Sequence, residues 1–333
     1  MNCIGSVKRT LTLIAILAVA CTAPAGGPGT SARPSMASPT VAAVPTFATS
    51  GSGLARVRAG SKPCGILGAA GSMWVSNFGD ATVVRLDPVS GLRLGDPVPT
   101  GASPCGMAEG AGSVWTSDYA GNSATRIDEA TGKVIATIKV GRAPYDAAFA
   151  GGAAWITNYT DGTVSRIDPA TNTATTIAVG TGPAGLASSG GLLWVANQRS
   201  GTITEIDPVT SKVVGELATG GAPTWTSFDA KGFWVTDPPA GAVGYVDATA
   251  RTFTAWTKVG TTPTDGDVLG ATAWLPDLGT GDVIAVSMSG TVVTRVATGL
   301  KGPFVLCVYQ GAIWAADWMG TDIVRIDPTR AGK

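Results

Sequence analysis

Hydrophobic and polar residues alternate in short runs along most of this chain, and each run ends in residues that favour turns. Between residues 183 and 220 there are four such runs, at 183–187, 191–197, 202–208 and 212–218. Runs of five to seven residues separated by Gly, Asn, Asp, Pro and Ser are typical of antiparallel strands joined by tight turns. This stretch therefore predicts four consecutive β-strands.

The same pattern recurs along the chain, and one tryptophan marks each recurrence. The marked residues are Trp74, Trp115, Trp155, Trp194, Trp234, Trp274 and Trp314. Successive tryptophans are 39 to 41 residues apart, and each lies 11 residues after a proline. A repeat of about 40 residues belongs to the solenoid and propeller class, and four strands per unit favour propeller blades.

The two ends of the array predict how it closes. The last unit has three strands and ends at Lys333, whereas residues 53–60 form an unmatched fourth strand before Pro63. Pairing the N-terminal strand with the last blade would close a ring and protect the exposed strand edges. We therefore expect an all-β fold, a seven-bladed β-propeller with four antiparallel strands per blade.

The N-terminal region predicts export. Residues 1–20 combine Lys8 and Arg9 with a short apolar run, which is typical of a signal peptide. The end of this run, from Ala18 to Cys21, resembles a bacterial lipobox, which implies cleavage before Cys21 and lipidation of its sulfur. An ordinary secretory signal is the alternative. Residues 21–52 are rich in Ala, Gly, Pro, Ser and Thr and predict a disordered tether, with the propeller at 53–333.

Composition narrows the functions that are open. Lys plus Arg and Asp plus Glu are both 23, so no bulk charge favours nucleic acid. The chain has no histidine, which removes the commonest general base and metal ligand. We expect no cofactor and no metal. The expected location is the extracytoplasmic side of the cell membrane, periplasmic or at the cell surface, with the lipid anchor as the only membrane contact.

The repeat also resembles a known family. The motifs Trp74-Val-Ser-Asn77, Trp155-Ile-Thr-Asn158 and Trp194-Val-Ala-Asn197 are similar to the repeat of the YVTN propellers. The chain is also similar to the related streptogramin (virginiamycin B) lyases. This resemblance implies a ligand-binding face around the central channel. The lyases use histidine and glutamate with Mg²⁺ on that face. This sequence has no histidine, so it has no counterpart of the catalytic histidines of the family.

Positions shared by all blades predict structure, and positions that differ predict function. The tryptophans should pack between sheets, and the Asn or Asp that ends each second strand should cap a turn. Residues just after the repeat proline, or just after that cap, should reach the channel face. The candidate ligand-binding residues there are Phe78, Tyr119, Tyr145, Asp146, Tyr159, Arg199, Trp225, Asp265, Asp267 and Trp318. The simplest alternatives are aromatic rings that cover the seams between blades and carboxylates that are solvated.

Cys64 and Cys105 occupy the same position in neighbouring blades. In an exported protein they could form a disulfide if their Cα atoms lie roughly 4.4–6.8 Å apart.

These sequence features leave three classes of function open. The first is a monomeric, lipid-anchored module that binds a protein, a peptide or a cell-envelope component through the aromatic face. The second is a streptogramin lyase-like enzyme with altered, histidine-free chemistry, and the third is a purely architectural repeat without a ligand. The absence of histidine favours a non-enzymatic role over the family mechanism.

Overall fold

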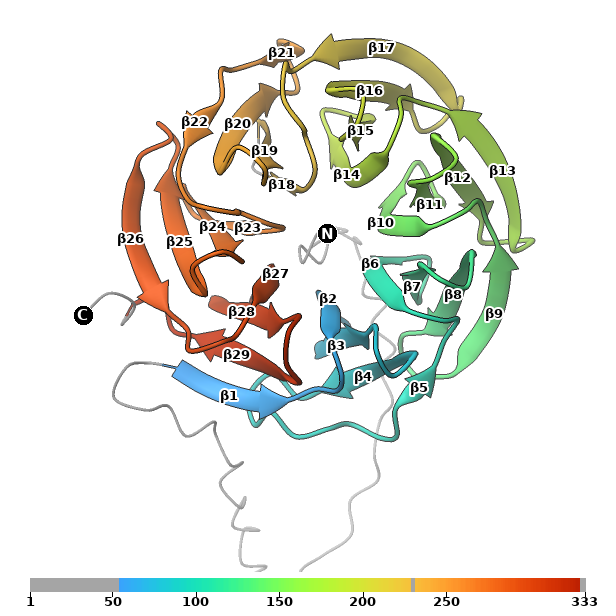
Figure 1. The fold of residues 1–333 in the computed structure, drawn as a ribbon. Coiled ribbons are helices and arrows are strands. Elements are labelled where there is room, and N and C mark those ends of the chain that lie inside the picture. The colour runs from blue at the N-terminus through green and yellow to red at the C-terminus, as the bar shows by residue number, and fades with distance from the viewer. Residues whose placement is uncertain (1–53, 229–230, 330–333) are drawn as a thin grey trace, which may run out of the picture. The chain divides into compact units, whose positions relative to one another are not determined.

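The computed structural model describes residues 54–228 and 231–329, and the regular structure in these ranges is entirely β-strand (Figure 1). Seven antiparallel sheets surround a central channel, and the innermost strand of each sheet is the one that contains or follows the repeat proline. The described chain is therefore a seven-bladed β-propeller, as the tryptophan repeat predicts. The predicted signal peptide (1–20), the tether (21–52) and Cys21 lie outside the described residues. The described part of the chain has no helix suited to crossing a membrane.

The second strand of every blade carries the repeat tryptophan, and in five blades the innermost strand begins at the repeat proline. In the other two blades Pro223 and Pro263 lie before the innermost strand. The innermost strands are β2 (Pro63–Ala69), β6 (Pro104–Gly110), β10 (Pro144–Ala150), β14 (Pro183–Ser189), β18 (Thr226–Phe228), β23 (Asp267–Leu269) and β27 (Pro303–Tyr309). The second strands are β3 (Ser72–Asn77), β7 (Ser113–Asp118), β11 (Ala153–Asn158), β15 (Leu192–Asn197), β19 (Gly232–Asp237), β24 (Thr272–Asp277) and β28 (Ala312–Asp317). Blades are numbered 1 to 7 in this order.

The outer two strands follow in the same order. The third strands are β4 (Thr82–Leu86), β8 (Ser123–Asp128), β12 (Thr163–Asp168), β16 (Thr202–Asp207), β20 (Ala242–Asp247), β25 (Asp282–Ser287) and β29 (Asp322–Ile326). The outermost strands are β5 (Val98–Pro99), β9 (Val134–Lys139), β13 (Thr173–Ala178), β17 (Lys212–Ala218), β21 (Thr252–Phe253) with β22 (Thr257–Lys258), β26 (Val292–Ala297) and β1 (Leu54–Arg58).

The ring closes through its first strand. β1 pairs antiparallel with β29 from Leu54 opposite Ile326 to Arg58 opposite Asp322, so blade 7 takes its outer strand from the other end of the chain. The backbone N–H of Ala59 then donates to the carbonyl of Thr321 at 2.9 Å and extends the contact beyond the strand. The predicted closure is confirmed.

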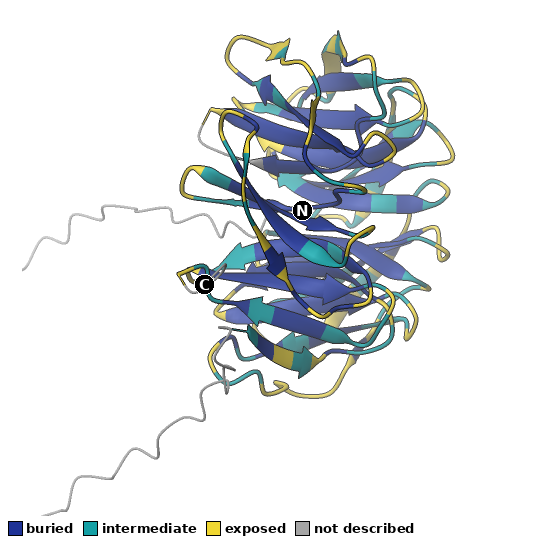
Figure 2. Cartoon of the chain, turned by 60° about the vertical axis from the view of Figure 1, so that its left-hand side comes forward, coloured by how far each residue is buried: buried dark blue, intermediate teal, exposed yellow. Residues whose placement is uncertain are grey.

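The repeat tryptophans form the core, as predicted. All seven are between 0 and 6% exposed. Each packs between its own blade and a neighbour, as Trp155 does against Leu186 and Leu193 of blade 4. The indole N–H of Trp155 donates to the carbonyl of Ala150 at 3.0 Å, at the end of its own inner strand. Burial is concentrated in the strands, and the exposed residues lie mainly in the turns and on outer strands (Figure 2).

Two blades depart from strands of five to seven residues at their outer edge. In blade 1 the outer strand is only Val98–Pro99, because Pro97 and Pro99 have no N–H to donate to a ladder. In blade 5 the outer strand is split into β21 and β22. Between them Trp256 turns inward, where its indole N–H donates to the carbonyl of Thr219 at 2.9 Å.

Candidate functional site

One backbone hydrogen bond per blade brings the loops of the channel face together. In six blades the residue after the Asn or Asp cap donates its N–H to the carbonyl just before the repeat proline, as Tyr119 does to Ser103 at 2.9 Å. Blade 5 has Pro238 at this position, which has no N–H. The bond holds the side chain after each second strand beside the start of the inner strand. Blade-specific aromatic residues therefore gather around one mouth of the channel.

The caps themselves are structural. The side-chain carbonyl of Asn158 accepts the N–H of Gly141 at 3.0 Å. The carboxylate of Asp277 accepts the N–H groups of Thr261 and Thr262 at 2.9 and 2.8 Å.

Asp237 and Asp317 make the same kind of bond, so these caps satisfy the backbone of the loop that enters their own blade, in agreement with the predicted turn-capping role. The side-chain carbonyls of Asn77 and Asn197 are buried without a hydrogen-bond donor among the described residues.

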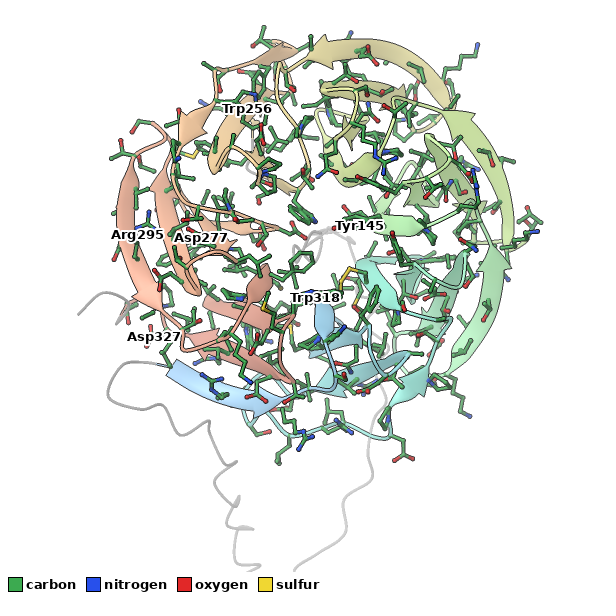
Figure 3. The ribbon with its side chains drawn as sticks, viewed as in Figure 1. Tyr145, Trp256, Asp277, Arg295, Trp318 and Asp327 are labelled. Atoms are coloured by element: carbon green, nitrogen blue, oxygen red, sulfur yellow. A yellow bond between two sulfur atoms is a disulfide. The ribbon has the colours of Figure 1, made fainter. Side chains whose placement is uncertain are left out.

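Six aromatic rings form a closed circuit on this face. Neighbouring ring centroids are 4.9 to 6.2 Å apart all the way around. In order, the members of this aromatic circuit are Phe78, Tyr119, Tyr145, Trp225, Phe304 and Trp318, which contacts Phe78 again. Tyr145 and Trp318 lie beside the channel axis (Figure 3). Five of the six rings are partly exposed.

Two members of the circuit differ from the sequence expectation. Trp225 is only 9% exposed, so it is buried against Tyr145 and Phe304 rather than displayed on the rim. Phe304 was not among the predicted ligand-binding residues, yet it closes the circuit between Trp225 and Trp318. Its position directly after the repeat proline, shared with Tyr145, was the signal that could have identified it.

Tyr159 and Arg199 flank the circuit. The Tyr159 ring lies 5.8 Å from that of Tyr145, and its hydroxyl donates to the side-chain carbonyl of Gln198. The Arg199 guanidinium lies 4.7 Å from the centroid of Tyr159. On the other side, the ammonium of Lys62 lies 5.7 Å from the Trp318 centroid. Both cations are exposed, and Lys62 stacks on a member of the circuit whereas Arg199 stacks on the flanking ring.

Two of the predicted carboxylates fasten blades to one another. Asp146 accepts the N–H of Ala147 and, across the seam to blade 4, the N–H of Leu186, both at 2.8 Å. Asp267 accepts the N–H of Val268 at 2.8 Å and that of Val308 in blade 7 at 2.9 Å. Both side chains are at most 2% exposed. The interpretation of these acids as solvated loop residues is therefore wrong.

Asp265 is the third buried carboxylate, at 1% exposure. Its backbone carbonyl accepts the N–H of Leu306, which places it beside Phe304 in the next blade. Burial, together with the neighbouring carboxylates of Asp146 and Asp267, raises the pKa of Asp265 to about 8. Burial likewise raises the pKa of Asp267 to about 6. The three acids thus form one electrostatic group in the channel wall.

The aromatic circuit and the acids adjoin each other. Burial raises the pKa of the Tyr145 hydroxyl above its ordinary value, and the charges of Asp265 and Asp146 act in the same direction. Tyr145 precedes Asp146 in the chain, and Asp265 pairs in parallel with Val305, the residue after Phe304. The site therefore combines an apolar, partly exposed rim with an acidic interior.

Cys64 and Cys105 lie beside the site and are joined in a disulfide, with Cα atoms 4.8 Å apart. The bond links the inner strands of blades 1 and 2 where they approach most closely. A side chain on Gly65 would collide with the carbonyl oxygen of Cys105, and one on Gly106 would collide with the backbone of Asp146. Glycine is therefore required for this close packing.

Among residues 54–228 and 231–329, no group of three or more His, Cys, Asp or Glu side chains is arranged to hold a metal ion.

Comparison with known proteins identifies the fold. No protein-family model and no curated protein matches the sequence. Among solved structures, a streptogramin B lyase is 15% identical with a TM-score of 0.72, covering 82% of this chain and 97% of that chain. A catalytically inactive histidine-to-alanine variant of virginiamycin B lyase from Staphylococcus aureus, with quinupristin, is 17% identical with a TM-score of 0.72, covering 82% and 98%.

A hydrazine synthase from Kuenenia stuttgartiensis is similar as well, at 15% identity and a TM-score of 0.69, covering 80% of this chain and 96% of that chain. One fold thus serves proteins with different activities, and identities of 15 to 17% describe the fold alone. This chain is a seven-bladed β-propeller of the kind found in the streptogramin lyases.

Proposed function

We propose that this chain is a lipid-anchored, extracytoplasmic binding module that holds a protein, a peptide or a cell-envelope component on its aromatic face. The observation that carries the proposal is the closed aromatic circuit. Five of its rings are partly exposed although a core of seven buried tryptophans already stabilises the blades. Aromatic side chains at a channel mouth offer a large contact area at a low entropy cost, which is typical of recognition surfaces.

The anchoring part of the proposal comes from the N-terminal sequence. The run before Cys21 and the tether that follows would keep the propeller on the outer side of the membrane and free to meet a partner. Labelling of cells with a palmitate analogue tests this. The wild-type protein should incorporate label and a Cys21→Ser variant should not, whereas an unlabelled wild-type protein would overturn the anchoring claim.

Paired variants on the same strand test the binding face. Phe304 and Tyr309 lie at opposite ends of β27, and Tyr145 and Phe149 lie near opposite ends of β10. Phe304→Leu and Tyr145→Leu should abolish capture of cell-envelope components by the immobilised protein, whereas Tyr309→Leu and Phe149→Leu should not. Thermal unfolding checks that all four variants are folded. Capture that survives the first pair, or that is lost equally in both pairs, contradicts the proposal.

A second candidate function is an enzyme on the same face with histidine-free chemistry. Asp265 favours it, because a carboxyl group with a pKa near 8 is largely protonated at neutral pH and could act as a general acid. The similar virginiamycin B lyase was inactivated by loss of one histidine, and this chain has none. Incubation with quinupristin separates the two functions. If the wild-type protein linearises quinupristin and the Asp265→Asn variant does not, the chain is an enzyme that uses Asp265. If quinupristin stays intact, the binding module is favoured.

A further inference from the structure

We infer that the group held inside the aromatic circuit is an organic cation, an alkylated ammonium such as a trimethylammonium group. The inference rests on the proposed binding function and names the chemistry that the face would recognise. Three features of the site support it: the spacing of the rings, the sign of the charge in the channel wall, and the basic side chains that already stack on Trp318 and Tyr159.

The spacing of the rings fits a cation of this kind. Adjacent centroids are separated by 4.9 to 6.2 Å around six members. Because every ring lies close to two others, a cation seated among them would lie within about 6 Å of more than one ring, the range in which an aromatic ring attracts a positive charge. Several rings acting together are the usual means of binding a quaternary ammonium.

The channel wall carries the matching charge when its acids are ionised, and the raised pKa values of Asp265 and Asp267, about 8 and about 6, place full ionisation at alkaline pH. Asp146, Asp265 and Asp267 are the acids next to the circuit, and each is at most 2% exposed. The carboxylates of Asp146 and Asp267 already accept two backbone N–H groups each. They therefore supply negative potential rather than open coordination positions, which suits a bulky, weakly hydrated cation better than a metal ion.

Two rings of this face already interact with positive charges. The Lys62 ammonium lies 5.7 Å from the centroid of Trp318, a member of the circuit, and the Arg199 guanidinium lies 4.7 Å from that of Tyr159 beside it. Both basic side chains are exposed, whereas the acids of the channel wall are buried. Rings of this face therefore already hold cations at the distances that the inference requires.

The test compares choline with 3,3-dimethylbutanol, a neutral molecule of nearly the same shape, by isothermal titration calorimetry on the whole chain at pH 9, where the channel acids are ionised. We expect choline to bind at least about tenfold more tightly, since cation–π attraction summed over several desolvated rings depends on the charge. Equal binding of the two molecules, or no binding of choline, overturns the inference. Phosphatidylcholine vesicles beside phosphatidylglycerol vesicles show whether a lipid headgroup is also accepted, and binding of choline alone identifies a soluble ligand.

Matched variants locate the binding. Phe304→Leu and Trp318→Leu should weaken choline binding by about 3- to 30-fold, the range expected for one ring, and Tyr309→Leu should not change it. Asp265→Asn at pH 9 should weaken choline binding and leave that of 3,3-dimethylbutanol unchanged. An equal loss in Tyr309→Leu would overturn the inference. If choline does not bind, but capture of cell-envelope components still depends on Phe304 and Tyr145, the cation inference fails and the proposed binding function stands.

Discussion

The carboxylate of Asp146 accepts the backbone N–H of Leu186 at 2.8 Å, across the seam between blades 3 and 4. Asp267 makes the equivalent bond to Val308 between blades 6 and 7. A propeller has no continuous hydrogen-bonded sheet between blades, so such bonds add to side-chain packing and to isolated backbone contacts such as that from the Leu306 N–H to the Asp265 carbonyl. The channel acids therefore contribute to the fold as well as to the charge of the site.

Asp146→Ala should lower the free energy of unfolding by about 2–4 kcal/mol, because two buried N–H groups lose their acceptor. Denaturation by guanidinium chloride measures this change. Asp168→Ala is the matched control, since Asp168 caps an exposed turn by accepting the N–H of Ala170 at 2.8 Å. A loss no larger than that of the control would mean that the seam bond contributes nothing.

The closure of the ring by β1 leads to a second prediction. A chain that begins at Ser61 lacks the strand that pairs with β29, so blade 7 would expose a hydrophobic edge with unpaired backbone groups. We expect it to unfold without a sharp transition or to aggregate, whereas a chain that begins at Gly53 should melt like the full-length protein. Calorimetry on the two chains measures the difference. Equally sharp and equally high melting of both would contradict the closed ring.

The two kinds of tryptophan should respond differently to the same substitution. Trp155 is fully buried, so Trp155→Ala should lower the free energy of unfolding by about 3–5 kcal/mol through loss of packing and the cavity left behind. Trp318 is partly exposed on the channel face, and Trp318→Ala should cost about 1 kcal/mol. Paired denaturation curves check both values. A Trp318→Ala variant as unstable as Trp155→Ala would assign that ring to the core.

The fold could be predicted from the sequence because the same residue pattern recurs in each of the seven blades. The spacing from Pro144 to Trp155 recurs in every blade, and the unmatched residues 53–60 define the closing strand. The same regularity placed Phe78, Tyr119 and Trp318 on one face, since each follows a second strand. Positions fixed by backbone register can thus be predicted without a structure.

The remaining details of the site depend on local departures from symmetry. The innermost strand changes register just after the repeat proline in five blades, but only blade 3 of these five has a carboxylate two residues after that proline. That residue, Asp146, reaches the neighbouring blade. Trp225 and Phe304 belong to different blades, and only the packing of their rings shows that both complete the circuit. A repeat pattern gives the average blade, so it could not predict contacts that exist at one seam alone.

The buried acids also predict how stability changes with pH. The folded-state pKa values of Asp265 and Asp267 are raised from 3.8 to about 8 and about 6. A carboxyl group with a raised pKa stabilises the folded state fully below its unfolded pKa, and this contribution is lost as the pH rises through the folded values. The free energy of unfolding should therefore fall between pH 4 and pH 9, by an amount on the order of a few kcal/mol.

Asp265→Asn tests this assignment, because asparagine keeps the shape of the side chain and cannot ionise. The variant should lose most of the decline between about pH 6 and pH 9 and should be more stable than the wild type at the alkaline end. The turn carboxylates of Asp128, Asp161 and Asp207 have lowered pKa values, so they are ionised throughout this window and add no slope. Thermal melts at each pH give the comparison. A wild-type profile that is flat from pH 5 to pH 9, or a variant with an unchanged slope, would show that Asp265 is ionised at neutral pH, and its proposed role as a general acid would then fail.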